Sequence, residues 1–103
     1  MATYWITFRI AEDRVGSRTY EDRYKALQDA IHQRATQWWA EPTSFYAFTS
    51  LASIDTLAAE FKRAIAPSHD VFLIRVMDTK SAIICGKNSD KDVFAMMPYL
   101  NAA

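Results

Sequence analysis

Glycine, cysteine and histidine are all scarce in this chain of 103 residues. The two glycines, Gly16 and Gly86, are too few for the glycine-rich loops that cradle a phosphate, which excludes Walker and Rossmann nucleotide sites. The single Cys85 cannot form an internal disulfide, and with only His32 and His69 beside it there is no Cys/His ligand set for zinc. We therefore expect no metal and no cofactor, and interpret Cys85 as a small buried apolar residue.

An excess of charge of one sign is also missing. Twelve Lys and Arg balance twelve Asp and Glu, so any binding to nucleic acid or to an anionic surface must come from local charge. The longest uncharged stretch, residues 42–54, is well short of the roughly 20 residues of a membrane helix. The first residues, Met1–Trp5, lack the basic and then apolar pattern of a signal peptide. We expect a cytoplasmic protein without a membrane partner.

Apolar residues, by contrast, are plentiful. Half of the residues are hydrophobic and 14% are aromatic, which is too much apolar material for a disordered chain. The length fits one small domain, so residues 1–103 are expected to fold as a single unit. Within it, residues 3–86 form the predicted core and residues 87–103 a polar linker followed by a closing segment, either a helical turn or an arm.

Five segments rich in β-branched and aromatic residues are predicted to be strands. They are residues 4–10, 38–41, 44–50, 71–77 and 82–86. In the first of them Tyr4, Ile6, Phe8 and Ile10 share one face. Because Trp38 and Trp39 are consecutive, they point in different directions, and we expect one to be buried and the other to serve an interface.

Two helices are predicted from capping residues and apolar spacing. Thr19, with Asp22 three residues later, marks the start of the first helix, whose apolar stripe extends from Tyr20 to Trp38. Ser53 is expected to cap the second helix, which carries a stripe of apolar residues and ends at Ala66-Pro67. This second stripe consists of Ile54, Leu57, Ala58, Phe61 and Ile65.

The order of these elements predicts an α+β fold. It is the ferredoxin-like βαββαβ plan, an antiparallel sheet with two helices on one face, plus an added C-terminal strand. The other face of the sheet would carry Trp5, Thr7 and Arg9 from the first strand. Residues 71–77 would add either Val71, Leu73, Arg75 and Met77 or Phe72, Ile74 and Val76, and both sets are largely apolar.

An uncovered apolar sheet face is rare in a soluble monomer. We therefore predict a homodimer packed through this face, with Trp5, Thr7, Leu73 and Arg75 at the interface. The competing use of such a face is to stack unpaired RNA bases. Neutral net charge and the lack of a Gly-Phe-rich strand motif favour the dimer over that use.

Four short segments carry a resemblance to a known family. Residues 3–10 (TYWITFRI), Trp38-Trp39, residues 43–50 (TSFYAFTS) and residues 68–76 (SHDVFLIRV) resemble the SinR-like small bacterial proteins. These are related in fold to the dimeric CRISPR adaptation subunit once described as an endoribonuclease, to VapD toxins and to the GhoS-type antitoxin that cleaves messenger RNA. The resemblance implies a ferredoxin-like homodimer whose residues 82–86 add to the partner's sheet, and a role with RNA.

The catalytic residues of those relatives transfer only in part. The resemblance implies a metal-binding aspartate at the end of the first strand, where this chain has Arg9, and a fixed cation repels a metal. Asp13 is the reserve candidate for that role, and its alternative is an ordinary solvated loop carboxylate. A metal-independent route would pair a base, His69, with the cation Arg9. Alternatively, His69 and Asp70 cap a loop and Arg9 pairs with Asp70.

Basic residues gather around the loop after the first strand. Arg14, Arg18 and Arg23 are candidates for contacts with nucleic-acid phosphates. The interspersed Glu21 and Asp22 would weaken such contacts, and the alternative is a solvated helix face.

Three functions fit these observations. The first is an RNA-associated homodimer, similar to SinR-like and GhoS-like endoribonucleases, whose nuclease activity is weak or lost. The second is a protein-binding inhibitor or antitoxin-type module without catalysis, in a toxin-antitoxin or phage counter-defence setting. The third is an enzyme acting on small molecules, for which no motif identifies a substrate.

Overall fold

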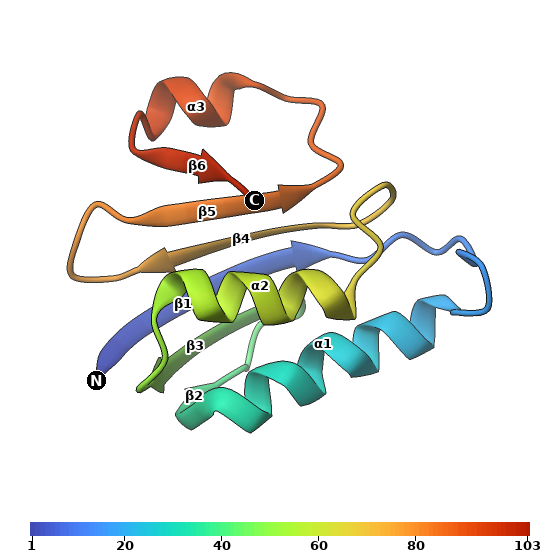
Figure 1. Ribbon diagram of the computed structural model, residues 1–103, viewed down its shortest axis with the longest axis horizontal. Helices are drawn as coiled ribbons and strands as arrows, with labels where there is room; N and C mark the ends of the chain where they lie inside the picture. The colour runs from blue at the N-terminus through green and yellow to red at the C-terminus, as the bar shows by residue number, and fades with distance from the viewer.

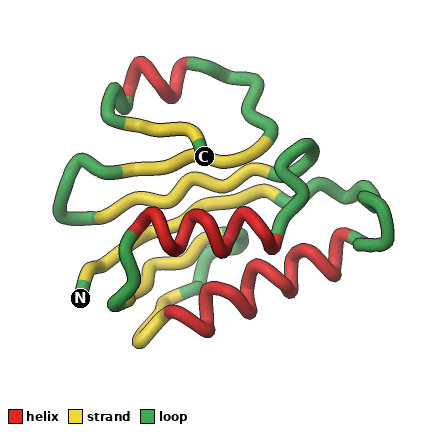
Figure 2. Tube along the Cα trace, viewed as in Figure 1, coloured by secondary structure: helices red, strands yellow, loops and turns green.

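The computed structural model describes residues 1–103 and contains six strands and three helices (Figures 1 and 2). The strands are β1 (Ala2–Arg9), β2 (Ala35–Trp39), β3 (Phe45–Ser50), β4 (Val71–Val76), β5 (Ala82–Gly86) and β6 (Leu100–Ala102). The helices are α1 (Tyr20–Arg34), α2 (Ile54–Ala64) and α3 (Asp92–Met96). The predicted α+β class is confirmed. None of the helices has the length and apolar composition needed to cross a membrane.

All six strands belong to one sheet in the order β2-β3-β1-β4-β5-β6. Neighbouring strands are antiparallel except β5 and β6, which are parallel, so the sheet is mixed rather than antiparallel as predicted. The reason is that the segment containing α3 carries the chain back along the sheet, and β6 then runs in the same direction as β5 (Figure 1). Strand β5 is paired within its own chain on both sides, by β4 and by β6.

The starts of both long helices follow the predicted chemistry. Thr19 and Asp22 form a reciprocal capping box at the start of α1, and the Ser53 side chain accepts from the Thr56 N–H at the start of α2. The prediction that the stripe of α1 continues to Trp38 is wrong, because α1 ends at Arg34 and β2 follows without a loop. As a strand, residues 35–39 pair with the backbone of β3. If α1 continued through these residues, this pairing would be lost.

The main core lies between the two long helices and one face of the sheet (Figure 1). In β1 the residues facing the helices are Tyr4, Ile6 and Phe8. The cross-strand register places Phe72 and Ile74 of β4 on that same side, so Leu73 and Arg75 point to the opposite face. This register decides between the two arrangements of residues 71–77 that the sequence allowed.

One ion pair lies entirely inside the protein. Arg23 of α1 and Asp70, at the entrance to β4, are both 0% exposed, and Arg23 Nε donates to Asp70 Oδ2 at 2.8 Å. The remaining polar atoms are also satisfied: Asp70 accepts from the backbone N–H groups of Ala11 and Ala66, and Arg23 donates to the carbonyls of Ala11 and Arg18. A buried pair is tolerated only when its partners are complete in this way.

Removing one partner of this pair leaves an uncompensated buried charge. We expect Asp70→Asn to lower the free energy of unfolding by about 3–5 kcal/mol, measured by urea titration. The control is Asp29→Asn, which breaks the exposed pair with Lys25 on α1 and should cost only about 0.5 kcal/mol or less. Equal losses in both variants would contradict a structural role for the buried pair.

The same pair makes stability depend on pH. Burial alone would raise the pKa of Asp70, but hydrogen bonds from Arg23, Ala66 and Ala11 together hold the pKa below its ordinary value of 3.8. A carboxyl group with a lowered folded-state pKa stabilises the protein above its unfolded pKa and loses that contribution as pH falls through the folded value. We expect unfolding free energy to decline below about pH 3.8 in the parent, and the decline to be smaller in Asp70→Asn.

Candidate nucleic-acid interface

The sheet face opposite α1 and α2, here named the open face, is defined by the strand register. Pairing places Trp5 opposite Ala47 and Arg75, and Thr7 opposite Phe45 and Leu73. The open-face positions of the four strands from β2 to β4 are Gln37, Trp39, Phe45, Ala47, Thr49, Thr3, Trp5, Thr7, Arg9, Val71, Leu73 and Arg75. They contain two arginines and no acidic residue, although the whole chain is neutral.

Three aromatic rings form a row across the open face, here named the aromatic row. It extends from Trp39 on edge strand β2, through Phe45 on β3, to Trp5 on β1. The Trp5 and Phe45 rings are stacked, with centroids 6.3 Å apart and planes inclined by 22°, whereas Trp39 meets Phe45 edge-on at 6.2 Å. Trp39 is 53% exposed, and Trp5 and Phe45 are half-buried. The row therefore offers ring surface to water at a fixed geometry.

Both arginines of the open face are held by local contacts. The Arg75 guanidinium lies 5.2 Å from the centroid of the Tyr99 ring, a cation–π contact. Arg9 Nη2 donates to the carbonyl of Lys87 at 3.2 Å. Neither arginine forms an ion pair with a carboxylate, so both positive charges remain available to an anionic ligand.

The C-terminal segment covers the β4 and β5 part of the open face. Leu73, Ala82, Ile84 and Leu100 form a second, smaller core cluster. Partly buried residues of the C-terminal segment pack against it, namely Val93, Phe94, Met97 and Tyr99. The segment predicted as a helical turn or an arm thus contains both a short helix and a strand, and it shields apolar surface that would otherwise face water.

This cover changes the predicted dimer interface. Leu73 is only 8% exposed, so it is not the free apolar contact that the predicted interface needs, and Arg75 lies over the Tyr99 ring of its own chain. Thr7 is exposed and Trp5 is half-buried. Self-association through these residues stays a prediction, with a smaller apolar area than expected because the chain covers part of the face itself.

The predicted catalytic residues are not joined to one another. Arg9 projects from the end of β1 to Lys87, His69 Nδ1 lies 2.7 Å from the Ser68 hydroxyl, and Asp13 is exposed in the loop after β1. No hydrogen bond or ion pair links any two of the three. The alternative pairing of Arg9 with Asp70 is wrong, because Asp70 is occupied by Arg23. No group of three or more His, Cys, Asp or Glu side chains could hold a metal ion.

The predicted phosphate-binding arginines separate into different roles. Arg14 is exposed, as a phosphate contact requires. Arg18 donates to the carbonyls of Ala64 and Ile65, where it caps the C-terminal end of α2. Arg23 is completely buried against Asp70, which corrects its assignment to nucleic-acid binding, because it reaches no solvent-borne ligand.

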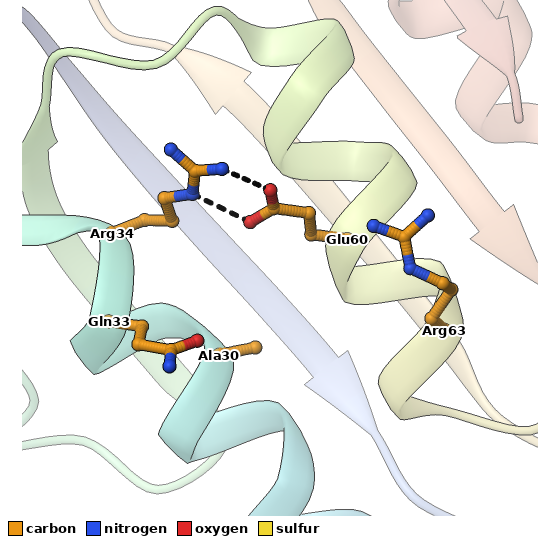
Figure 3. A pocket seen from close by; sticks show the side chains of 5 residues that line it. All are labelled: Ala30, Gln33, Arg34, Glu60 and Arg63. Atoms are coloured by element: carbon orange, nitrogen blue, oxygen red, sulfur yellow. Dashed lines mark hydrogen bonds and ion pairs between the residues drawn. The ribbon is translucent and has the colours of Figure 1, made fainter.

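A polar pocket of about 520 Å³ lies between α1 and α2 (Figure 3). Arg34 and Glu60 form a two-bond ion pair there, in which Arg34 Nε donates to Glu60 Oε1 at 2.7 Å. The hydrogen bond and charge of each partner lower the pKa of Glu60 and raise the pKa of Arg34. Because both groups stay ionised and satisfy each other, this pocket contains no poised acid or base.

Two members of the aromatic row, Phe45 and Trp39, were missed as a binding site by sequence reasoning. Neither Trp38 nor Trp39 is buried, at 49% and 53% exposure, so the expectation that one would be buried is wrong. Trp38 faces the helix side, where its ring stacks on His32 with centroids 4.4 Å apart. The position of Trp39 beside Phe45 depends on the register of β2 with β3, which contains a bulge between Ala35 and Gln37.

Comparisons with known proteins identify no relative. No family model, no curated protein and no solved structure matches this chain.

The exposure of Trp39 predicts that it contributes little to folding. We expect Trp39→Ala to change the free energy of unfolding by less than about 1 kcal/mol, since more than half of the side chain is already in water. Phe48→Ala, which removes a buried ring from β3, should cost about 3–5 kcal/mol. Chemical denaturation followed by circular dichroism measures both. A large loss in Trp39→Ala would assign this ring to stability rather than to binding.

Proposed function

We propose that this protein binds single-stranded RNA on its open face and has little or no nuclease activity. The observation that carries the proposal is the aromatic row of Trp39, Phe45 and Trp5, placed on a face that has two arginines and no acid. A base can stack on the exposed ring surface of this row, most readily on Trp39, because every base has a flat π surface.

Stacking energies are large enough to carry the binding. Each base stacked on an aromatic side chain contributes about 1–3 kcal/mol, and sheet surfaces of this kind hold two or three bases. The exposed face of Trp39 is the most accessible of the three rings. Because stacking does not read base edges, we expect broad tolerance of sequence, with unpaired RNA preferred over duplex.

Local charge supports the same face. In the register of β1 with β4, Arg75 lies opposite Trp5, and Arg9 follows Thr7 at the end of β1, so one cation stands beside the Trp5 end of the aromatic row and the other farther along the same face. The net neutrality of the chain does not oppose this, because charges elsewhere are screened beyond about 10 Å at ordinary salt. Arg14 adds a further exposed cation in the loop after β1.

The fold is consistent with the family hypothesis. Strands β4, β1, β3 and β2 are neighbours in that order, with α1 and α2 packed on one face, and this supports a ferredoxin-like core extended by β5, α3 and β6. Kinship with SinR-like proteins belongs to this proposal and rests on the four sequence segments. RNA binding rests on the open face itself and stands without that kinship.

The proposal of weak or lost cleavage rests on the contacts of the candidate catalytic groups, each of which is bonded to a residue outside the proposed pair or is exposed in a loop. A metal-independent reaction requires a base within hydrogen-bond reach of the 2′-hydroxyl and a cation at the phosphate. His69 is engaged with Ser68, while Arg9 projects onto the open face toward Lys87. The arrangement supports binding of RNA more directly than its cleavage.

Replacement of the most exposed ring tests the binding. We expect Trp39→Ala to weaken binding of a fluorescein-labelled hexauridine by roughly 5- to 150-fold in fluorescence anisotropy, the equivalent of one lost stack. The matched control is Trp38→Ala, which removes a similarly exposed ring from the opposite side of the same strand and should bind normally. Equal affinity of parent and Trp39→Ala, or no binding by the parent, would refute the proposal.

Cleavage is tested on the same RNA. We expect hexauridine to stay intact on a denaturing gel after prolonged incubation with the protein, equally in Mg²⁺ and in EDTA. If products form, each of the variants Arg9→Ala and His69→Ala should abolish them while the circular dichroism spectrum stays unchanged, because Arg9 is the candidate cation and His69 the candidate base of the reaction. Robust cleavage retained by both variants would exclude the proposed pair.

A further inference from the structure

Strand β2 is an unprotected edge of the sheet. It pairs only with β3, so the backbone N–H and C=O groups on its outer side have no strand partner. Its five residues, Ala35–Trp39, include no charged residue and no proline, and all but Ala35 are exposed. Edge strands are normally blunted by lysine, proline or shortness, because a bare edge accepts another strand. Strand β2 contains neither lysine nor proline, and its one irregularity, the register shift between Ala35 and Gln37, leaves Gln37–Trp39 in regular pairing with β3.

The opposite edge of the sheet is protected. It is formed by β6, which has only three residues, Leu100–Ala102, and α3 leads directly into it. A strand this short offers few backbone groups to a partner. The two edges of the sheet therefore differ in length, and β2 offers more unpaired backbone groups to another strand than β6 does.

We infer that two copies of this chain associate through β2, paired antiparallel across a two-fold axis. An isologous interface requires a surface complementary to itself, and an uncharged strand meets this requirement because no like charges face each other. With the axis perpendicular to the sheet, the two sheets join into one, and α1 and α2 of both copies lie on the same side.

A groove lies on the helix side of this edge. This groove of about 450 Å³ extends along the flank of α1 that faces away from α2. It ends at His32, whose ring stacks on Trp38 and whose Nε2 lies 3.1 Å from the Tyr46 hydroxyl. Trp38, which is 49% exposed, therefore lies beside both the groove and the free edge of β2. Pairing of β2 with a second copy would remove its exposed surface from water.

Charges along the groove are self-complementary. Glu21, Lys25 and Asp29 follow one another at intervals of one helical turn, so the signs alternate along this flank of α1. When two copies of the helix run antiparallel, an offset of one turn places Lys25 of one copy opposite Asp29 of the other, so the exposed Lys25–Asp29 pairs of both copies would join into one alternating network. An unrelated partner would have to supply this alternation, whereas a second copy already carries it.

Pairing through β2 would leave the open face free. Gln37 and Trp39 belong to that face in both copies, so the two aromatic rows would meet near the axis on one continuous surface. Self-association through β2 does not depend on RNA binding to this face.

A charge placed on the edge strand tests the interface. We expect the parent to sediment as a dimer at micromolar concentration, and Gln37→Lys to raise the dimer dissociation constant by roughly fivefold or more, because lysines of the two copies would lie close together. Thr7→Lys is the matched control, since it adds the same charge to the centre of the open face, away from the edge, and should leave the dimer intact.

Three outcomes would overturn the inference. A parent that sediments as a monomer at every concentration would do so, as would a dimer weakened by Thr7→Lys but not by Gln37→Lys, which places the interface on the open face. The third is a dimer unaffected by either variant.

Amide hydrogen exchange of the parent provides a test independent of mutation. Amides of residues 35–39 should exchange more slowly at high than at low protein concentration, whereas amides of β6 should not change. Exchange of residues 35–39 that does not depend on concentration would contradict pairing through β2, including in the case where Gln37→Lys fails to fold.

Discussion

The buried ion pair of Arg23 and Asp70 connects parts of the chain that are 47 residues apart in sequence. Through the backbone groups of Ala11 and Ala66 it also fixes the exit from β1 and the segment that leaves α2. The positions of α1, α2 and β4 at this end of the sheet therefore depend on one set of charged hydrogen bonds. Arg23 is paired with Asp70, and Arg18 caps the end of α2. The loop after β1 and the first turn of α1 therefore present fewer free positive charges to a ligand than their sequence suggests.

Local chemistry explains which elements could be predicted. The Thr19 and Asp22 capping box, the Ser53 cap and the strand at residues 82–86 depend on neighbours within a few residues, and they lie where expected. Arg23 could not be placed in the same way, because acidic residues beside it in sequence suggest a solvated face, while its true partner is distant. For Trp38 the sequence allowed both the end of the helix stripe and the start of a strand at residues 38–41, and pairing with β3 decides for the strand.

The candidate site was predictable only in part. Trp5 and Arg9 follow from alternation along the first strand, and they lie on the predicted face. Trp39 could be added only once the register of β2 was known, because a shift by one residue would exchange it with Trp38. The packing of the C-terminal segment over Leu73 could not be predicted either, because the apolar residues of the segment 93–100 are equally compatible with a free arm and with a packed segment.

The difference between the two edges of the sheet has a consequence for how many copies can join. A sheet with two bare edges would add molecules at both ends and grow into a fibre. Here the three residues of β6 close one end, so addition at β2 uses the single available end of each molecule. The short C-terminal strand would therefore act as a stop that makes any assembly through β2 finite, although two exposed tryptophans lie at the β2 edge.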